Sequence, residues 1–259
     1  MKPLKNHVII YDAECPMCAI YTGAFTQYGW LEKNGRWKYS EIEQFEGCHL
    51  VDKNKSRHEI ALVDLENKTV HYGLDSMLFI VAYKLPFLKP LFENTVFQVV
   101  MKQLYSLISY NRKVIAPSSK ENEQSCTPDF HVFYRFAYIM VALYLALLGF
   151  YYVGNSYDIG ISVILGIAGF WILNVLSSIY VMQEKALIYL GQLATIFLIG
   201  VLLSLPIAIA THFLGHSLVG EIIAFSIAAA VLIPQIIRRV KIAWRDYKKL
   251  TFDNVQQFA

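Results

Sequence analysis

Four long apolar segments after Asp129 constrain the fold of this chain more than any other feature. They lie at about 132 to 153, 159 to 182, 187 to 210 and 217 to 237. Each segment meets the requirement of roughly 20 residues for a helix that crosses a bilayer. The sequence therefore predicts an all-α transmembrane domain of four helices, with the lipid bilayer as its immediate partner.

The distribution of basic residues predicts the orientation of these helices. The linkers 154–158 and 211–216 contain no Lys or Arg, and the linker 183–185 contains Lys185. Cytoplasmic loops of membrane proteins are enriched in Lys and Arg, so we expect both termini to face the cytoplasm, in agreement with an even number of spans. The tail that follows Ile237 holds six basic residues: Arg238, Arg239, Lys241, Arg245, Lys248 and Lys249.

Composition divides the chain into four parts. Residues 1–118 are mixed and carry many of the charges, 119–131 form a linker, 132–237 hold the apolar segments, and 238–259 form a basic cytoplasmic tail. The first apolar run is about five residues long, shorter than the roughly 7 to 15 of a secretory signal. The net charge of +3 is too small to indicate nucleic-acid binding. We expect an integral protein of a bacterial inner (plasma) membrane, with the N-terminal domain in the cytoplasm.

A pair of cysteines at the start of the chain carries the chemistry. The β-prone run Val8 to Tyr11 leads into Asp12-Ala13-Glu14 and then Cys15-Pro16-Met17-Cys18. A strand that turns into a helix here would place two thiols at the helix start, with proline in its first turn. A helix N-terminus favours negative charge. Cys15 is therefore the predicted nucleophile, and Cys18, one turn on, the predicted resolving thiol.

Other roles for these residues stay open from the sequence. Asp12 either caps the helix, the role we place first, or accepts a proton during thiol exchange. Cys15 and Cys18 could instead bind a soft ion such as Cu(I) or Zn(II), or belong to a catalytically silent docking module. We expect no cofactor and no metal ion beside a redox-active Cys15–Cys18 disulfide. The sequence assigns no role to Cys48 or Cys126.

The elements that follow alternate between helix and strand. Patterns of apolar residues and breakers predict helices at 19–28, 74–84 and 95–114, and strands at 37–42, 59–65 and 69–72. The segment 43–58 is expected to be a loop or a short helix. A thioredoxin-like α/β domain requires elements in this order: a strand, a CxxC motif, a helix, a strand, a hairpin and a helix.

Three stretches in this order resemble the DCC family of thiol-disulfide oxidoreductases, also called DUF393. They are Val8 to Cys18 with its D-x-x-C-P-x-C pattern, Gly73-Leu74-Asp75-Ser76, and Tyr105 to Arg112. The resemblance covers about residues 5 to 116. It implies a thioredoxin-like fold with Asp12, Cys15 and Cys18 as the site residues. The expected function is a membrane-anchored thiol-disulfide oxidoreductase of the protein-disulfide reductase type, which acts on a protein or small-molecule disulfide with an unidentified electron donor.

Overall fold

The chain separates into two compact units. The computed structural model describes residues 2–117, 130–155, 160–182, 185–214, 226, 230–239 and 241. The first unit extends from Met1 to Tyr134 and the second from Arg135 to Ala259. The boundary falls three residues into the first apolar helix, which begins at Val132, so it lies close to the predicted end of the linker at residue 131.

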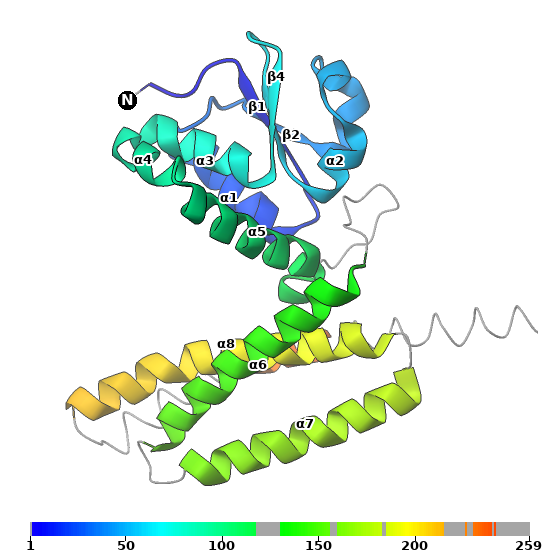
Figure 1. The fold of residues 1–259 in the computed structure, drawn as a ribbon, viewed down its shortest axis with the longest axis vertical. Helices are drawn as coiled ribbons and strands as arrows, with labels where there is room; N and C mark the ends of the chain where they lie inside the picture. Colours follow the sequence, from blue (N-terminus) through cyan, green and yellow to red (C-terminus); the bar gives the residue numbers. More distant parts are fainter. Residues whose placement is uncertain are drawn as a thin grey trace, which may run out of the picture. The chain divides into compact units, whose positions relative to one another are not determined.

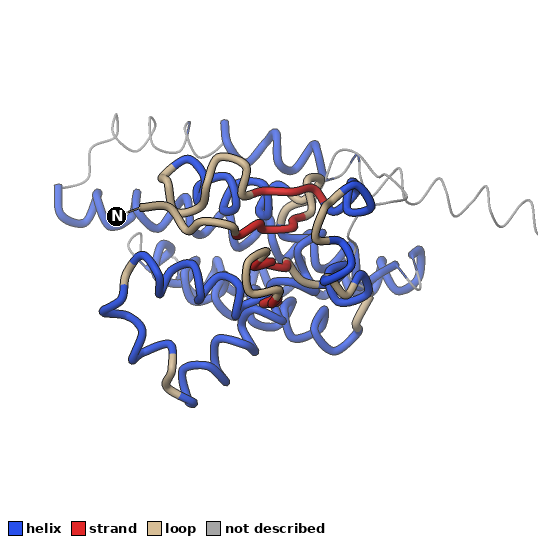
Figure 2. Tube along the Cα trace, turned by 90° about the horizontal axis from the view of Figure 1, so that it is seen from above, coloured by secondary structure: helices blue, strands red, loops and turns tan. Residues whose placement is uncertain are grey.

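The first unit is built on a four-stranded mixed sheet with the strand order β2-β1-β3-β4 (Figures 1 and 2). β1 (His7–Tyr11) pairs in parallel with the edge strand β2 (Arg36–Lys38). On its other side β1 pairs antiparallel with β3 (Ala61–Asp64), which forms a hairpin with β4 (Thr69–Tyr72). The two central strands, β1 and β3, are therefore buried almost throughout.

Both faces of the sheet are covered, because successive side chains of a strand point to opposite faces. On one face, α1 (Pro16–Gln27) and α3 (Gly73–Lys84) pack against the sheet through Phe25 and Ile80. On the other face the segment from Ile42 to Val51 supplies the cover. The two apolar clusters contain Leu4, Ile9, Phe25, Leu31, Ile60, Leu62 and Ile80 on the first face, and Val8, Ile10, Ile42, Phe45, Val51, Ala61 and Val63 on the second.

Short helical pieces connect these elements, and one of them corrects the sequence prediction. The predicted strand at 37–42 is wrong beyond Lys38, where a 3-10 helix, η1 (Tyr39–Gln44), replaces it. The register explains the change: Lys38 pairs with Tyr11, the last residue of β1, so the chain beyond has no strand to pair with. The other short elements are η2 (Cys48–Leu50), α2 (Lys53–His58), η3 (Pro86–Leu88) and α4 (Lys89–Phe92).

The last element of the first unit is the helix α5 (Thr95–Ile115), which begins at the N-cap Asn94. The Asn94 side chain accepts a hydrogen bond from the backbone N–H of Phe97 at 3.0 Å, so one of the unpaired donors at the helix start is satisfied. Helix α5 contacts α3 and α4. Near its C-terminal end Asn111, Arg112 and Val114 are buried.

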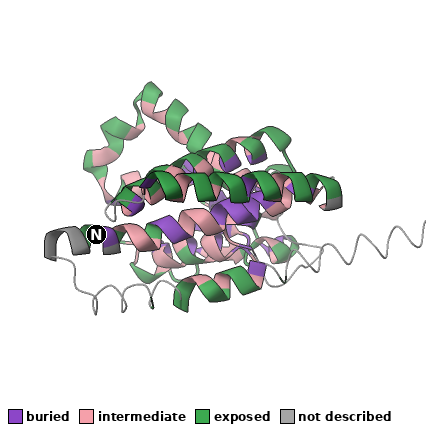
Figure 3. Cartoon of the chain, turned by 90° about the horizontal axis from the view of Figure 1, so that it is seen from below, coloured by how far each residue is buried: buried purple, intermediate pink, exposed green. Residues whose placement is uncertain are grey.

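The described part of the second unit contains three helices that are long and apolar enough to cross a bilayer. They are α6 (Val132–Asn155), α7 (Gly160–Met182) and α8 (Ala186–Leu214), and they match the first three predicted spans closely. Large apolar side chains such as Leu173 on α7 are exposed, and exposed positions run along much of the long helices (Figure 3). Such surfaces are compatible with lipid. Most of the fourth predicted span, 217–237, lies outside the described residues.

Candidate functional site

The two cysteines lie where β1 ends and α1 begins. Cys15 is the N-cap residue of α1, with an extended backbone (φ −80°, ψ 111°), and Pro16 follows in the first turn. The sulfur of Cys15 accepts a hydrogen bond from the backbone N–H of Cys18 at 3.4 Å. The helix therefore begins with a thiol in the place where Ser or Asp usually caps, and one of its unpaired N–H groups points at that sulfur.

Asp12 occupies the turn before the helix, so the predicted helix-capping role is wrong. Its Oδ1 accepts a hydrogen bond from the backbone N–H of Glu14 at 3.0 Å, two residues on, as in an Asx-turn. Its Oδ2 lies 3.6 Å from Nη2 of Arg112, and both side chains are buried. Burial raises the pKa of the Asp12 carboxyl, while the charge of Arg112 opposes the rise.

The two thiols differ in acidity. A hydrogen bond from the Cys18 side chain lowers the pKa of Cys15 to about 7, and the Cys18 backbone N–H and the Arg112 charge act in the same direction. Burial and the Asp12 charge oppose this shift. The pKa of Cys18 is raised, because its proton is held in the hydrogen bond to Cys15 and because it is buried. At pH 7, about half of Cys15 is therefore thiolate, whereas Cys18 stays protonated.

Two partly buried tyrosines lie near Cys18. The hydroxyl of Tyr21, one turn further along α1, hydrogen-bonds to Cys18. The hydroxyl of Tyr105 on α5 hydrogen-bonds to the backbone of Ile60, just before β3. Burial raises the pKa of both tyrosines, so they remain protonated and offer O–H donors around the thiols at neutral pH.

Arg112 is the cation of this cluster, although it is separated from Cys15 by almost a hundred residues of chain. Its charge acts on Asp12, on both cysteines and on Tyr105. Its Nη2 also donates a hydrogen bond to the carbonyl of Arg57 at 3.4 Å. The guanidinium therefore links α5 to the CxxC turn and to the end of α2.

A glycine with a left-handed backbone makes room for a carboxyl group beside this cluster. Gly73 has φ +57°, and a Cβ atom built there would lie 2.6 Å from Oε2 of Glu59 and 3.1 Å from Cε1 of Tyr105. Glycine therefore serves both the backbone conformation and the close approach of the two side chains. Burial raises the pKa of Glu59.

Sequence reasoning found part of this site. It named Asp12, Cys15 and Cys18, and the structure brings them together. It missed Tyr21 and Glu59, and it assigned no role to Tyr105 and Arg112. Helical spacing is the signal that could have found three of these residues. Tyr21 lies three residues after Cys18, and Tyr105 and Arg112 are seven residues, or two helical turns, apart.

The other candidate ligands do not join the pair in the part of the chain that the structure describes. Within that part there is no group of three or more His, Cys, Asp or Glu side chains that could hold a metal ion. Cys48 is a free, half-buried thiol that packs against the apolar cluster on the other face of the sheet. Cys126 lies outside the described residues.

Comparisons with family models, with curated proteins and with solved structures find no match to this chain. The site is therefore interpreted from its own geometry, and the resemblance to the DCC family stays a prediction.

Proposed function

We propose that this protein is a membrane-anchored thiol-disulfide oxidoreductase of the DCC type, with Cys15 as nucleophile and Cys18 as resolving thiol. One observation carries the proposal: Cys15 is the N-cap of α1, accepts a hydrogen bond from the Cys18 N–H, and has its pKa lowered to about 7. A thiolate at a helix N-terminus is the arrangement that activates cysteine for disulfide exchange.

The arrangement of the first unit supports this function. A sheet in the order β2-β1-β3-β4, with β2 parallel to β1 and with β3 and β4 antiparallel, is the arrangement expected of a thioredoxin-like domain. A CxxC motif between the first strand and the first helix has the same place in such domains. We therefore propose a thioredoxin-like fold for residues 1–118.

The reaction that we propose is a two-electron exchange. The Cys15 thiolate attacks one sulfur of a substrate disulfide, forms a mixed disulfide, and releases the other sulfur as a thiolate that takes up a proton. Cys18 then loses its proton and attacks the Cys15 sulfur. This step closes the Cys15–Cys18 disulfide and releases the substrate's second thiol. The substrate is reduced and the dithiol oxidised, and an external dithiol donor must restore it.

We propose that Asp12 accepts the proton lost in the second step. Its carboxyl is buried, it lies three residues before Cys15, and its raised pKa brings its affinity for a proton closer to that of a thiol. The role is tested by Asp12→Asn, which keeps an oxygen to accept the Glu14 N–H. A rate of disulfide closure equal to that of the wild type would contradict it.

The redox function predicts opposite behaviour of two serine variants. Cys15→Ser should abolish reduction of a small aromatic disulfide, because the attacking thiolate is gone. Cys18→Ser should accumulate mixed disulfides that a thiol reagent releases, because the second step is blocked. The measurements are turnover with excess dithiothreitol and intact mass under non-reducing conditions. Stoichiometric Cu(I) or Zn(II) in protein purified without chelator, together with no turnover, would favour the metal-binding alternative.

We also propose four transmembrane helices with both termini in the cytoplasm of a bacterial inner membrane. The support is the three apolar helices α6, α7 and α8, the apolar sequence 217–237 and the basic tail. A protein stripped of its own cysteines and carrying Thr69→Cys in β4 should resist a membrane-impermeant maleimide on intact cells. The matched variant Ser156→Cys, in the first linker, should be labelled. The reverse pattern would invert the orientation.

A further inference from the structure

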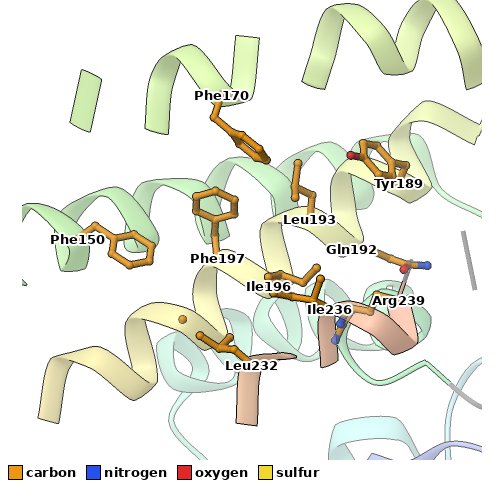
Figure 4. A pocket seen from close by; sticks show the side chains of 11 residues that line it. Phe150, Phe170, Tyr189, Gln192, Leu193, Ile196, Phe197, Leu232, Ile236 and Arg239 are labelled. Atoms are coloured by element: carbon orange, nitrogen blue, oxygen red, sulfur yellow. The ribbon is translucent and has the colours of Figure 1, made fainter. Parts of the chain in front are cut away.

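The second unit contains a cavity of about 440 Å³ that the proposed redox site does not use. It is lined by Phe150 of α6, Phe170 of α7, one face of α8 between Tyr189 and Gly200, and helical residues within 230–239 (Figure 4). Its size lies within the range of roughly 300 to 1,000 Å³ that is common for small-molecule sites. The lining residues outside α6 and α7 are Tyr189, Gln192, Leu193, Ile196, Phe197, Gly200, Leu232, Ile236 and Arg239.

Most of the lining is aromatic and aliphatic. The ring of Phe197 lies 6.1 Å from that of Phe150 and 5.6 Å from that of Phe170, measured between centroids. Leucine and isoleucine side chains complete this wall. Such a surface favours contact with a hydrocarbon chain, which needs no hydrogen-bond partner.

Polar groups gather at one end of the cavity. Gln192, Arg239 and Tyr189 lie toward one side of the view, and Phe150 lies toward the other (Figure 4). Gln192 is only 5% exposed, and its Oε1 has no hydrogen-bond partner. Arg239 is 2% exposed and supplies the one formal charge of the lining. The Tyr189 hydroxyl donates to Oδ1 of Asn174 at 2.6 Å, so its oxygen can still accept a hydrogen bond.

The polar end corresponds to the expected edge of the bilayer. Tyr189 and Gln192 belong to the first two turns of α8, which begins at Ala186, and Arg239 follows the fourth predicted span by two residues. From Tyr189 to Gly200 the helix rises about 16 Å, or about half of a bilayer core of ~30 Å. The cavity therefore has polar groups at head-group depth and apolar walls further in.

We propose that this cavity binds a lipid acid, with its acyl chain against the aromatic wall and its acidic head group between Arg239 and Gln192. A phosphate monoester with one negative charge accepts a hydrogen bond from a guanidinium and donates one O–H, and a fatty acid does the same while its carboxyl group is protonated. That O–H can donate to Oε1 of Gln192, which otherwise has no hydrogen-bond partner. Buried acceptors are rarely left without a hydrogen bond. The two sources of this chemistry are a free fatty acid and a phospholipid of the phosphatidic acid class.

Binding of radiolabelled palmitate to the full chain in nanodiscs of zwitterionic lipid, measured at about pH 4–5 where much of the acid keeps its O–H, tests the site. Saturable binding of one palmitate per chain is expected. Gln192→Leu should weaken this binding at least tenfold, because the substitution removes the acceptor and leaves an apolar side chain of similar size in its place. Gly200→Leu should reduce binding by filling the cavity, since a Cβ at Gly200 already lies 3.3 Å from Cζ of Phe150. Leu176→Ala, on α7 and outside the lining, should change nothing.

Competition separates the two sources of the ligand. Displacement of palmitate by phosphatidic acid at lower concentration than by unlabelled palmitate would assign the site to a phospholipid, and the reverse order would assign it to a free acid. Absence of saturable binding for both ligands would overturn the proposal. Binding that Gln192→Leu leaves unchanged would also overturn it, and this variant alone decides if Gly200→Leu does not fold.

Discussion

Cys18→Ala is expected to give Cys15 a higher pKa than Cys18→Ser does. The largest cause of the lowered pKa of Cys15 is the hydrogen bond from the Cys18 side chain. Serine keeps an O–H that can donate to the Cys15 thiolate, and alanine keeps no donor. Both variants lack the thiol that we propose as the resolving one, so the first attack on a disulfide is observed alone. The comparison therefore isolates one hydrogen bond.

The size and the sign of the effect depend on pH. With a pKa of about 7, about half of Cys15 is thiolate at pH 7, whereas a thiol with the ordinary value of 9.0 is on the order of 1% thiolate. A thiolate of lower pKa is less nucleophilic, with a Brønsted slope of about 0.4–0.5. A variant in which the pKa of Cys15 has returned to 9.0 should therefore react only about fivefold more slowly at pH 7. Above pH 9 the order should reverse, because the alanine variant then has the more nucleophilic thiolate.

Rates of the first thiolate release from a small aromatic disulfide, measured between about pH 5 and 10, check this prediction. The inflection of the rate profile gives the pKa of Cys15 in each variant. Two superimposable profiles would mean that the helix N-terminus and Arg112 set the acidity of Cys15 without the Cys18 side chain.

Much of the architecture follows from local patterns in the sequence. The hairpin at 69–72, the helix that begins at the CxxC motif and three apolar helices are found within a few residues of their predicted limits. Each depends on a signal contained in a short window, such as the continuous hydropathy of α7 or Pro16 in the first turn of α1.

The errors have a common physical origin, which is that pairing and capping depend on neighbours. β2 ends at Lys38 because its partner β1 ends at Tyr11. Asp12 does not cap α1, because the helix begins four residues later and the Cys15 sulfur occupies the capping position. Asp is the better cap former in general, so a rule based on residue type chooses the wrong residue here.

The composition of the site depends on topology still more strongly. Arg112 and Tyr105 reach the CxxC turn only because α5 returns to the sheet beside α3. No local pattern of sequence states that the guanidinium of Arg112 lies 3.6 Å from Asp12. The position of Cys15 at the helix start was predictable from the turn in which it lies, but its electrostatic surroundings were not.

Arg112→Met is expected to destabilise the protein by about 3 kcal/mol at neutral pH. Removing one partner of a buried ion pair leaves the other charge uncompensated, at a typical cost of about 3–5 kcal/mol. The separation of 3.6 Å is longer than a charge-assisted hydrogen bond, which places the expected loss at the lower end. The loss of the hydrogen bond to the Arg57 carbonyl adds to it. Thermal unfolding of the full chain in detergent measures the difference, and Lys113→Met, which removes an exposed charge one residue on, serves as the control.

The pH dependence distinguishes the ion pair from simple loss of packing. The folded-state pKa of Asp12 is raised above its ordinary 3.8, so protonated Asp12 is favoured in the folded protein. The stability that proton binding by Asp12 contributes is complete below pH 3.8. It is lost as the pH rises through the folded-state pKa. Without Arg112 that pKa rises further. The deficit of Arg112→Met should therefore be largest at neutral pH and should shrink as the solution is acidified through the Asp12 pKa of the variant.

Adding Asp12→Asn to Arg112→Met should restore most of the lost stability, because the buried charge is then removed and the amide oxygen can still accept the Glu14 N–H. The double variant compared with the two single variants gives the coupling between the two residues. A deficit that is the same at every pH and is not relieved by Asp12→Asn would show that Arg112 acts through its packing and its Arg57 contact. In that case its charge would not control the carboxyl beside Cys15.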